Sequence, residues 1–244
     1  MRRSIGFLLM ATLAFTGPVR TIAQVKIITF GDSTAAPRKG VVTFSDVLES
    51  ELRRRQVQAT VINAGVPGNT TADAAGRFEK DVMARDPNLV IMLFGANDAA
   101  IDVWKTPPAI GPRVALNEYK RNLRGFIALL KRRGVGVILV TPTPIAWSEK
   151  LRQLYGKRPY NPNNPDGMNA FLKSYVGAVR RLAAQEKVEL IDVFSAFRSY
   201  ERTPGRNLDD LFLDGLHPNS LGHRMIADLI LERIERIIPV ETTN

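Results

Sequence analysis

The chain has 244 residues, 45% of them hydrophobic and 24% charged, and these proportions are typical of a globular protein rather than a disordered or fibrous one. Its 34 Lys and Arg residues against 24 Asp and Glu residues give a formal net charge of +10. The absence of cysteine excludes disulfides, thiolate catalysis and Cys-ligated metals, and two histidines, His217 and His223, are too few for a three-histidine metal site.

The first residues have the pattern of a secretory signal peptide. A basic start precedes an apolar run over 5–15, and small residues around Ala23 fit a cleavage site. The run is about half the ~20 residues that span a bilayer, and a membrane anchor is the alternative interpretation. We therefore expect residues 1–23 to be removed, residues 24–244 to form a single domain, and the protein to be secreted or periplasmic without a stable membrane anchor.

The chain stays basic after this cleavage, because loss of Arg2, Arg3 and Arg20 lowers the net charge only from +10 to +7. Such a surface attracts polyanions. The cations are spread along the chain, however, and are dense only at 53–55 and 131–133, at the ends of expected helices, where they complement the helix dipole. We therefore expect no nucleic-acid partner, and the positive charge favours anionic ligands in general.

Short β-branched runs alternate with longer amphipathic stretches, which is the pattern of βαβ units around a parallel sheet. In chain order, the expected strands are 25–30, 59–63, 89–94, 135–141 and 188–193. The expected helices are 43–55, 71–85, 116–133, 168–187 and 221–238. The sequence thus predicts an α/β fold, a three-layer αβα sandwich with a five-stranded parallel sheet of flavodoxin-like type.

Two connections, 99–115 and 142–167, are too long for simple turns, and the second is rich in proline. Loops of this length in a compact domain usually carry function. Since ligands of open α/β sheets bind beyond the carboxyl ends of the strands, we expect the functional site at that edge.

A serine lies where the first strand is expected to end, in Gly31-Asp32-Ser33-Thr34. This position favours a nucleophile, although Gly-Asp-Ser is also a common turn composition. A serine hydroxyl needs a base to become an effective nucleophile, and this chain offers only its two histidines.

His217 follows Asp214 by three residues, with a glycine between them that permits a sharp turn. The Asp214 carboxylate can then hold the imidazole Nδ1–H and leave Nε2 free for Ser33. His223 falls within the following expected helix and is interpreted as structural.

Two further strand ends supply hydrogen-bond donors. Gly65 can offer its backbone N–H with no side chain in the way, and Asn97 can donate from its amide. Together with the Ser33 backbone N–H, these donors could converge on an oxyanion.

Four blocks in this order resemble the SGNH hydrolase superfamily, the GDSL esterases and lipases. They are Gly-Asp-Ser-Thr at 31–34, Gly65, Gly-Ala-Asn-Asp at 95–98 and Asp-Gly-Leu-His-Pro at 214–218. The resemblance covers nearly the whole of 24–244. It implies a catalytic triad of Ser33, His217 and Asp214, an oxyanion hole of Ser33, Gly65 and Asn97, and no metal or organic cofactor.

Thr34 stands where lipase-like members commonly have leucine, and in this it is similar to the rhamnogalacturonan acetylesterase branch. The long loops are polar and carry aromatic rings that could stack on sugars, with loop packing as the alternative: Trp104, Trp147, Tyr155 and Tyr160. We therefore expect a secreted serine esterase that removes acetyl groups from carbohydrate esters. The main alternative is a lysophospholipase, arylesterase or thioesterase on the same fold, and a catalytically inactive carbohydrate-binding module is a further one.

Overall fold

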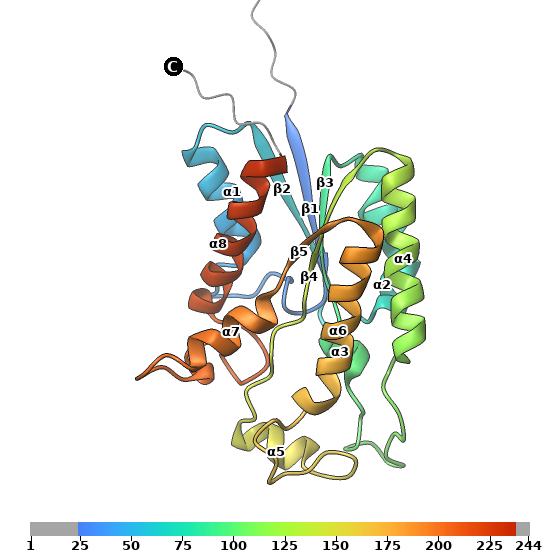
Figure 1. Ribbon diagram of the computed structural model, residues 1–244, viewed down its shortest axis with the longest axis vertical. Helices are drawn as coiled ribbons and strands as arrows, with labels where there is room; N and C mark the ends of the chain where they lie inside the picture. The colour runs from blue at the N-terminus through green and yellow to red at the C-terminus, as the bar shows by residue number, and fades with distance from the viewer. Residues whose placement is uncertain (1–23, 238–244) are drawn as a thin grey trace, which may run out of the picture.

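The computed structural model describes residues 24–237, which are arranged around one parallel sheet (Figure 1). The expected signal peptide, residues 1–23, lies outside the described residues, as does residue 238 of the last predicted helix. In the described range, no helix combines the length and the apolar character that crossing a membrane requires.

The sheet has five parallel strands in the order β2-β1-β3-β4-β5, which confirms the predicted number and direction. The strands are β1 (Val25–Gly31), β2 (Ala59–Gly65), β3 (Leu89–Leu93), β4 (Gly136–Val140) and β5 (Glu189–Ile191). Gly31, the last residue of β1, pairs with Gly65 on one side and with Leu93 on the other. The residues that follow these three strands therefore share one edge of the sheet.

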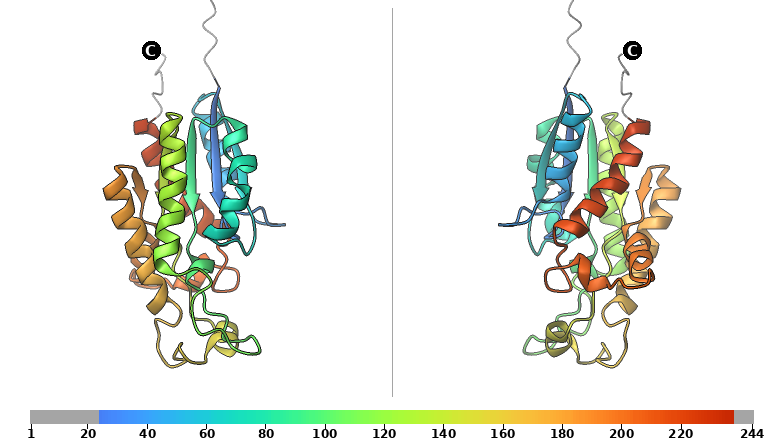
Figure 2. Two further views of the ribbon diagram at one scale, coloured as in Figure 1. Left: turned by 90° about the vertical axis from the view of Figure 1, so that its right-hand side faces the viewer. Right: turned by 90° about the vertical axis from the view of Figure 1, so that its left-hand side faces the viewer.

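Helices cover both faces of the sheet (Figure 2). The helices α1, α7 and α8 pack on one face, and α2, α4 and α6 pack on the other, which confirms the αβα sandwich. The helices are α1 (Phe44–Arg54), α2 (Thr71–Asp81), α3 (Ala96–Ala99), α4 (Leu116–Arg132), α5 (Glu149–Tyr155), α6 (Asn169–Glu186), α7 (Val193–Glu201) and α8 (Ser220–Ile237), with short 3₁₀ turns at Met83–Arg85 and Leu208–Leu211.

The strand β3 shows why the strands are continuous apolar runs rather than alternating ones. All five of its residues are buried. Val90 and Met92 point into the core beneath α2, α4 and α6, whereas Leu89, Ile91 and Leu93 point into the core beneath α1 and α8. A strand that is covered on both faces needs apolar side chains at every position.

Three short helices, α3, α5 and α7, were not predicted. Local side chains start two of them: Ser148 Oγ accepts a hydrogen bond from the Leu151 N–H (3.4 Å), and Asp192 Oδ1 accepts one from the Ser195 N–H (3.1 Å). The Asp192 cap also ends the last strand at Ile191, so the predicted strand 188–193 was too long. The helix predicted over 71–85 is likewise interrupted after Asp81.

The long connections lie where the sequence predicts them. The short helices α3 and α5 follow β3 and β4 and lie beyond the carboxyl ends of the strands, below the sheet in Figure 1. These connections therefore border the edge to which the predicted site residues belong.

Candidate active site

Ser33 lies in a tight turn that directly follows β1. The Ala35 and Ala36 N–H groups both donate to the Asp32 carbonyl (3.1 and 3.0 Å), and the Thr34 N–H donates to Asp32 Oδ1 (2.8 Å). Ser33 is half-buried, and no hydrogen bond within residues 24–237 uses its hydroxyl or its backbone N–H. The turn thus presents Ser33 with both of its polar groups uncommitted.

Asp32 anchors this turn from inside the protein, where it is fully buried. Its Oδ2 atom has no hydrogen-bond partner. Burial raises the pKa of Asp32 to about 7 against the opposing hydrogen bonds from Thr34, and the nearby charge of Asp98 adds to the rise. The carboxyl beside Ser33 is therefore partly protonated near neutral pH.

The end of β2 packs directly on the Ser33 turn. A Cβ atom on Gly65 would lie 2.4 Å from the Ala36 nitrogen, so no larger residue fits there without displacing the turn. Asn63 joins the two segments: its Nδ2 donates to the Ala35 carbonyl (2.7 Å), and its Oδ1 accepts from the Gly65 N–H (2.9 Å). The predicted oxyanion donor Gly65 is therefore beside the Ser33 turn, with its N–H bonded to Asn63.

Asn97 belongs to α3, immediately after β3. Its Nδ2 donates to the Asn69 carbonyl (3.0 Å), and its Oδ1 accepts from Arg113 Nη1 (3.0 Å). Asn69 in turn lies in the turn after β2, whose Val66 N–H donates to the Gly31 carbonyl (3.1 Å). A chain of hydrogen bonds thus connects Asn97 to the residues that precede Ser33.

Arg77 of α2 holds the same strand ends together, and it is not among the predicted site residues. Its guanidinium donates to the carbonyls of Gly31 (2.9 Å) and Ala64 (2.8 Å) and to Asn69 Oδ1 (2.6 Å). It also lies over the Phe30 ring, 4.5 Å from the centroid. No local pattern marks this arginine, because its partners come from β1, β2 and the turn that precedes α2.

His217 and Asp214 form the hydrogen-bonded pair that their spacing predicts. The His217 Nδ1 atom is 2.9 Å from Asp214 Oδ2 and 3.1 Å from Oδ1, and the His217 backbone N–H donates to Oδ1 (2.9 Å). Gly215 between them has a φ of +83°, and a Cβ there would lie 2.6 Å from the Ala146 carbonyl oxygen. Glycine therefore allows the turn that brings the carboxylate to the imidazole.

The contact with His217 keeps the Asp214 carboxyl in its ionised form. Burial raises the pKa of Asp214, but hydrogen bonds from the His217 ring and backbone outweigh it, and the pKa lies below its ordinary value. Asp214 is thus ionised at neutral pH and can stabilise a protonated imidazole. The hydrogen bonds within 24–237 do not join His217 to Ser33.

His223 belongs to α8 and is buried where this helix packs on Phe44 of α1. Its Nδ1 accepts a hydrogen bond from the Phe44 N–H (3.2 Å), and its ring stacks on the Phe44 ring. Burial lowers the pKa of His223 to about 4, which keeps it neutral. These contacts agree with a packing role.

The four aromatic residues proposed for substrate binding divide into two pairs. Tyr155 and Tyr160 are only 9% and 3% exposed, and the Tyr160 hydroxyl accepts from the Ile101 N–H (2.8 Å). Both pack the two long loops together, so they offer no ring face to a ligand. Trp104 is 44% exposed and Trp147 is half-buried, and these two remain available at the surface.

Trp147 borders two clefts. One, of about 600 Å³, is also lined by Asp214 and Gly215, and the other, of about 650 Å³, is lined by Asn163 and Asn164. The indole N–H donates to the Pro162 carbonyl (3.2 Å), which fixes the ring at the junction of the two clefts. Trp147 thus borders both clefts, one of which extends to Asp214.

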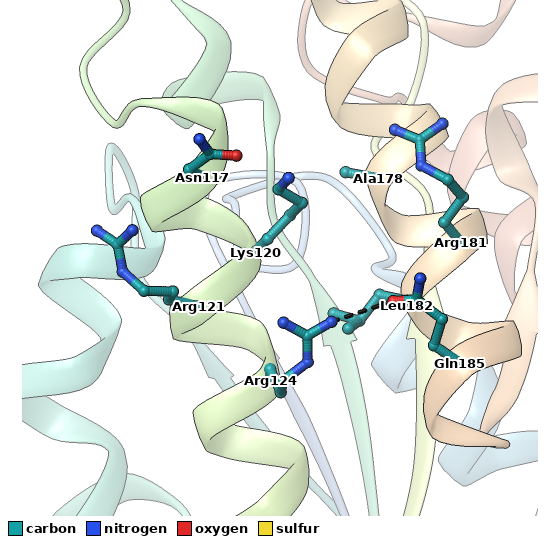
Figure 3. Close-up of a pocket in the computed structure, with 8 residues that line it drawn as sticks. All are labelled: Asn117, Lys120, Arg121, Arg124, Ala178, Arg181, Leu182 and Gln185. Carbon is teal, nitrogen blue, oxygen red and sulfur yellow. Dashed lines mark hydrogen bonds between the residues drawn. The ribbon is translucent and has the colours of Figure 1, made fainter.

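A third cleft, of about 380 Å³, lies between α4 and α6 (Figure 3). Four cationic side chains line it: Lys120, Arg121, Arg124 and Arg181. None of the predicted site residues lies there. Separately, within 24–237, no group of three or more His, Asp and Glu side chains is arranged to hold a metal ion.

The sheet, the serine turn at the end of β1 and the Asp–His pair before α8 define a hydrolase of the SGNH fold. The sequence model of the GDSL-like lipase/acylhydrolase family matches residues 29–225, and the chain belongs to this family. The predicted resemblance is therefore confirmed, and with it the prediction of an enzyme that hydrolyses carboxylic esters.

Individual relatives agree with this assignment. An acetylxylan esterase from Geobacillus stearothermophilus is 30% identical over 179 residues, which are 71% of each chain. An arylesterase from Vibrio mimicus is 24% identical and covers 93% of this chain and 96% of its own. The crystal structure of a lipase/acylhydrolase from Enterococcus faecalis superposes with a TM-score of 0.71 at 26% identity, over 90% of this chain and all of that one.

Proposed function

We propose that this esterase removes acetyl groups from carbohydrate esters, with Ser33 as the nucleophile, His217 as the general base and Asp214 as the residue that orients it. The observation that carries the proposal is the Asp214–His217 pair (2.9 Å), which holds Nδ1 and leaves Nε2 free to accept the Ser33 proton. The similarity to an acetylxylan esterase supports the choice of an acetylated carbohydrate.

The reaction proceeds in two acyl transfers. Ser33 Oγ attacks the ester carbonyl carbon while its proton passes to His217 Nε2. The tetrahedral intermediate collapses when His217 gives that proton to the sugar ester oxygen, whose bond to the carbonyl carbon breaks, and the sugar leaves as a free alcohol. Water, deprotonated by the same imidazole, then attacks the acetyl-Ser33 carbonyl. The bond to Ser33 Oγ breaks, His217 returns its proton to Oγ, and the acetyl group leaves as acetate.

The negative oxygen of each intermediate is stabilised by the Ser33 and Gly65 N–H groups and by the Asn97 amide. The Gly65 N–H donates to Asn63 Oδ1 in this structure. It therefore exchanges that partner for the oxyanion during the reaction.

The cleft that joins Trp147 to Asp214 is where we place the sugar. Its polar lining favours a short acyl group on a hydrophilic alcohol over a long lipid chain. The alternative is an arylesterase or another lipolytic enzyme on the same fold, which the arylesterase relative favours. Export of the protein, directed by residues 1–23, is part of the proposal, and N-terminal sequencing of protein from the culture medium and the periplasm tests it.

The decisive experiment measures acetate release from acetylated xylo-oligosaccharides and hydrolysis of p-nitrophenyl esters from acetyl to palmitoyl. Wild type, Ser33→Ala and a control, Ser50→Ala, are compared, because Ser50 is exposed on α1. We expect activity on acetyl esters in wild type and Ser50→Ala and its loss in Ser33→Ala. Preference for long acyl chains would establish the lipolytic alternative, and an active Ser33→Ala would exclude Ser33 as the nucleophile.

A further inference from the structure

Arg113, in the connection between α3 and α4, is held rigidly by a single carboxylate. Its Nε lies 3.1 and 3.2 Å from the two oxygens of Asp102, and its Nη2 lies 2.8 Å from Oδ1. The Asp102 side chain is only 4% exposed and also pairs with Lys105 (2.7 Å). The planar guanidinium therefore has one orientation, and its remaining Nη1 group points to Asn97 Oδ1 (3.0 Å).

The Asn97 amide has one acceptor oxygen and two N–H donors. The oxygen accepts from Arg113, and one N–H donates to the Asn69 carbonyl (3.0 Å). The second N–H is committed to no partner in the part of the chain that the structure describes. This is the donor that the proposed mechanism directs at the oxyanion.

Arg113 fixes the orientation of the Asn97 amide, with Oδ1 toward the guanidinium and Nδ2 toward the Asn69 carbonyl. A guanidinium only donates, so a rotated amide would place the Nδ2 group against Arg113 Nη1 and the oxygen against the Asn69 carbonyl. Both contacts would then be repulsive. The residue that carries this carbonyl is itself anchored, because Arg77 Nε donates to the Asn69 side-chain Oδ1 (2.6 Å) and the Asn69 N–H donates to the Val66 carbonyl (3.3 Å).

We propose that Arg113 is a positioning residue of the oxyanion hole, which locks the Asn97 amide so that its free N–H faces the reacting carbonyl. The inference rests on the proposed function. It adds that the connection between α3 and α4 affects turnover through its contact with Asn97.

The test is a double-mutant cycle between Arg113 and Asn97 with p-nitrophenyl acetate as substrate. We expect Arg113→Ala to lower kcat about 10- to 100-fold, with KM changed less than about threefold, because misplacing a transition-state donor reduces turnover rather than binding. In an Asn97→Ala background, the same substitution should change kcat less than about twofold, because the group through which Arg113 acts is gone. Added guanidinium ion, at non-denaturing concentration, should restore part of the activity of Arg113→Ala but none to Asn97→Ala.

Arg121→Ala is the matched control, since Arg121 is an exposed arginine of α4, and it should leave kcat unchanged. If Arg113→Ala fails to fold, Arg113→Lys replaces it. Lysine keeps the positive charge but cannot bind Asp102 and Asn97 at the same time, so Arg113→Lys should lower kcat when Asn97 is present and leave it unchanged in the Asn97→Ala background. Equal losses of kcat with and without Asn97, or no loss in either variant, would overturn the inference. An inactive wild type, or an active Ser33→Ala, would instead overturn the proposed function.

Discussion

Asp214 differs from the other carboxylates near the site because both of its carboxylate oxygens have hydrogen-bond partners. It accepts from the ring and backbone of His217 and from the Leu216 N–H (3.1 Å), and these bonds lower its pKa despite its partial burial. Asp32 and Asp98 show the opposite behaviour, because each is buried with one oxygen unpartnered. Burial accordingly raises the pKa of Asp98 to about 6 and that of Asp32 to about 7.

Substitution Asp214→Asn tests the orienting role. An amide can present its NH₂ group to Nδ1, which would favour the tautomer that carries its proton on Nε2 and cannot deprotonate Ser33. We expect kcat for p-nitrophenyl acetate to fall about 10³- to 10⁴-fold with little change in KM. Asp228→Asn, at an exposed carboxylate of α8 paired with Arg224, is the control and should retain full activity. Wild-type turnover in Asp214→Asn would contradict the proposed triad.

The raised pKa of Asp32 leads us to expect that the folded protein becomes less stable as the pH rises toward 7. Between about pH 4 and pH 7 the folded protein keeps a proton on Asp32 that the unfolded chain has released, so stability falls as the pH rises through this window and levels off above it. Asp32→Asn cannot titrate. The difference between the unfolding free energies, that of Asp32→Asn minus that of wild type, should therefore increase by up to about 4 kcal/mol between pH 4 and pH 8. Each unit of pKa shift corresponds to about 1.4 kcal/mol. Urea unfolding at several pH values measures this, and parallel curves for the two proteins would contradict the raised pKa.

The connection from β4 to α6 is folded around α5 and its own side chains. Ser148 caps α5, Tyr155 and Tyr160 pack edge to face, and the Trp147 ring lies against Gly167. Gly167 has a φ of +49°, and a Cβ there would lie 2.3 Å from the Trp147 ring. The position of the indole at the junction of the two clefts thus depends on a glycine 20 residues away in the chain.

Substitution Gly167→Ala should displace the Trp147 indole. We expect KM for acetylated xylo-oligosaccharides to rise about fivefold, the effect of losing one stacking contact of about 1 kcal/mol, while p-nitrophenyl acetate is hydrolysed normally. Gly205→Ala is the control, because Gly205 has a similar φ of +77° but nothing within 4 Å of the added Cβ. An unchanged KM for the oligosaccharides would remove Trp147 from the proposed sugar site.

The molecule as a whole combines two apolar cores with a basic surface. One core lies beneath α2, α4 and α6 and the other beneath α1 and α8, and the sheet separates them. Four of the cationic side chains, Lys120, Arg121, Arg124 and Arg181, gather in the cleft between α4 and α6 (Figure 3). A net positive protein attracts anionic substrates over distances that salt shortens.

The charge predicts a salt effect that depends on the substrate. For acetylated oligosaccharides that carry uronic acids, kcat/KM should fall several-fold between low and roughly 0.5 M salt, because the Debye length falls below 5 Å in this range. For neutral acetylated xylo-oligosaccharides, kcat/KM should stay constant. The same response for both substrates would show that the basic surface has no part in substrate capture.

The strands were predictable because burial on both faces of a sheet demands a local composition, as in β3. Asp214 and His217 were predictable as a pair for a related reason, since three residues with a glycine between them define one turn. The helices α3 and α5, of four and seven residues, were not predictable because they are too short for a helical apolar period. The helix α7 was missed because the strand predicted over 188–193 ran across its Asp192 cap.

The sequence by itself determined the five strands and the five longer helices in chain order, and it placed Ser33, Gly65 and Asn97 at the ends of successive strands. Only the tertiary structure decided which contacts these residues make. Arg77 reaches the Gly31 carbonyl across 46 positions, Asn63 takes the Gly65 N–H, and Tyr155 and Tyr160 turn inward. The physical reason is that composition and spacing act along the chain, whereas hydrogen bonds and burial depend on which distant segments the packing brings together.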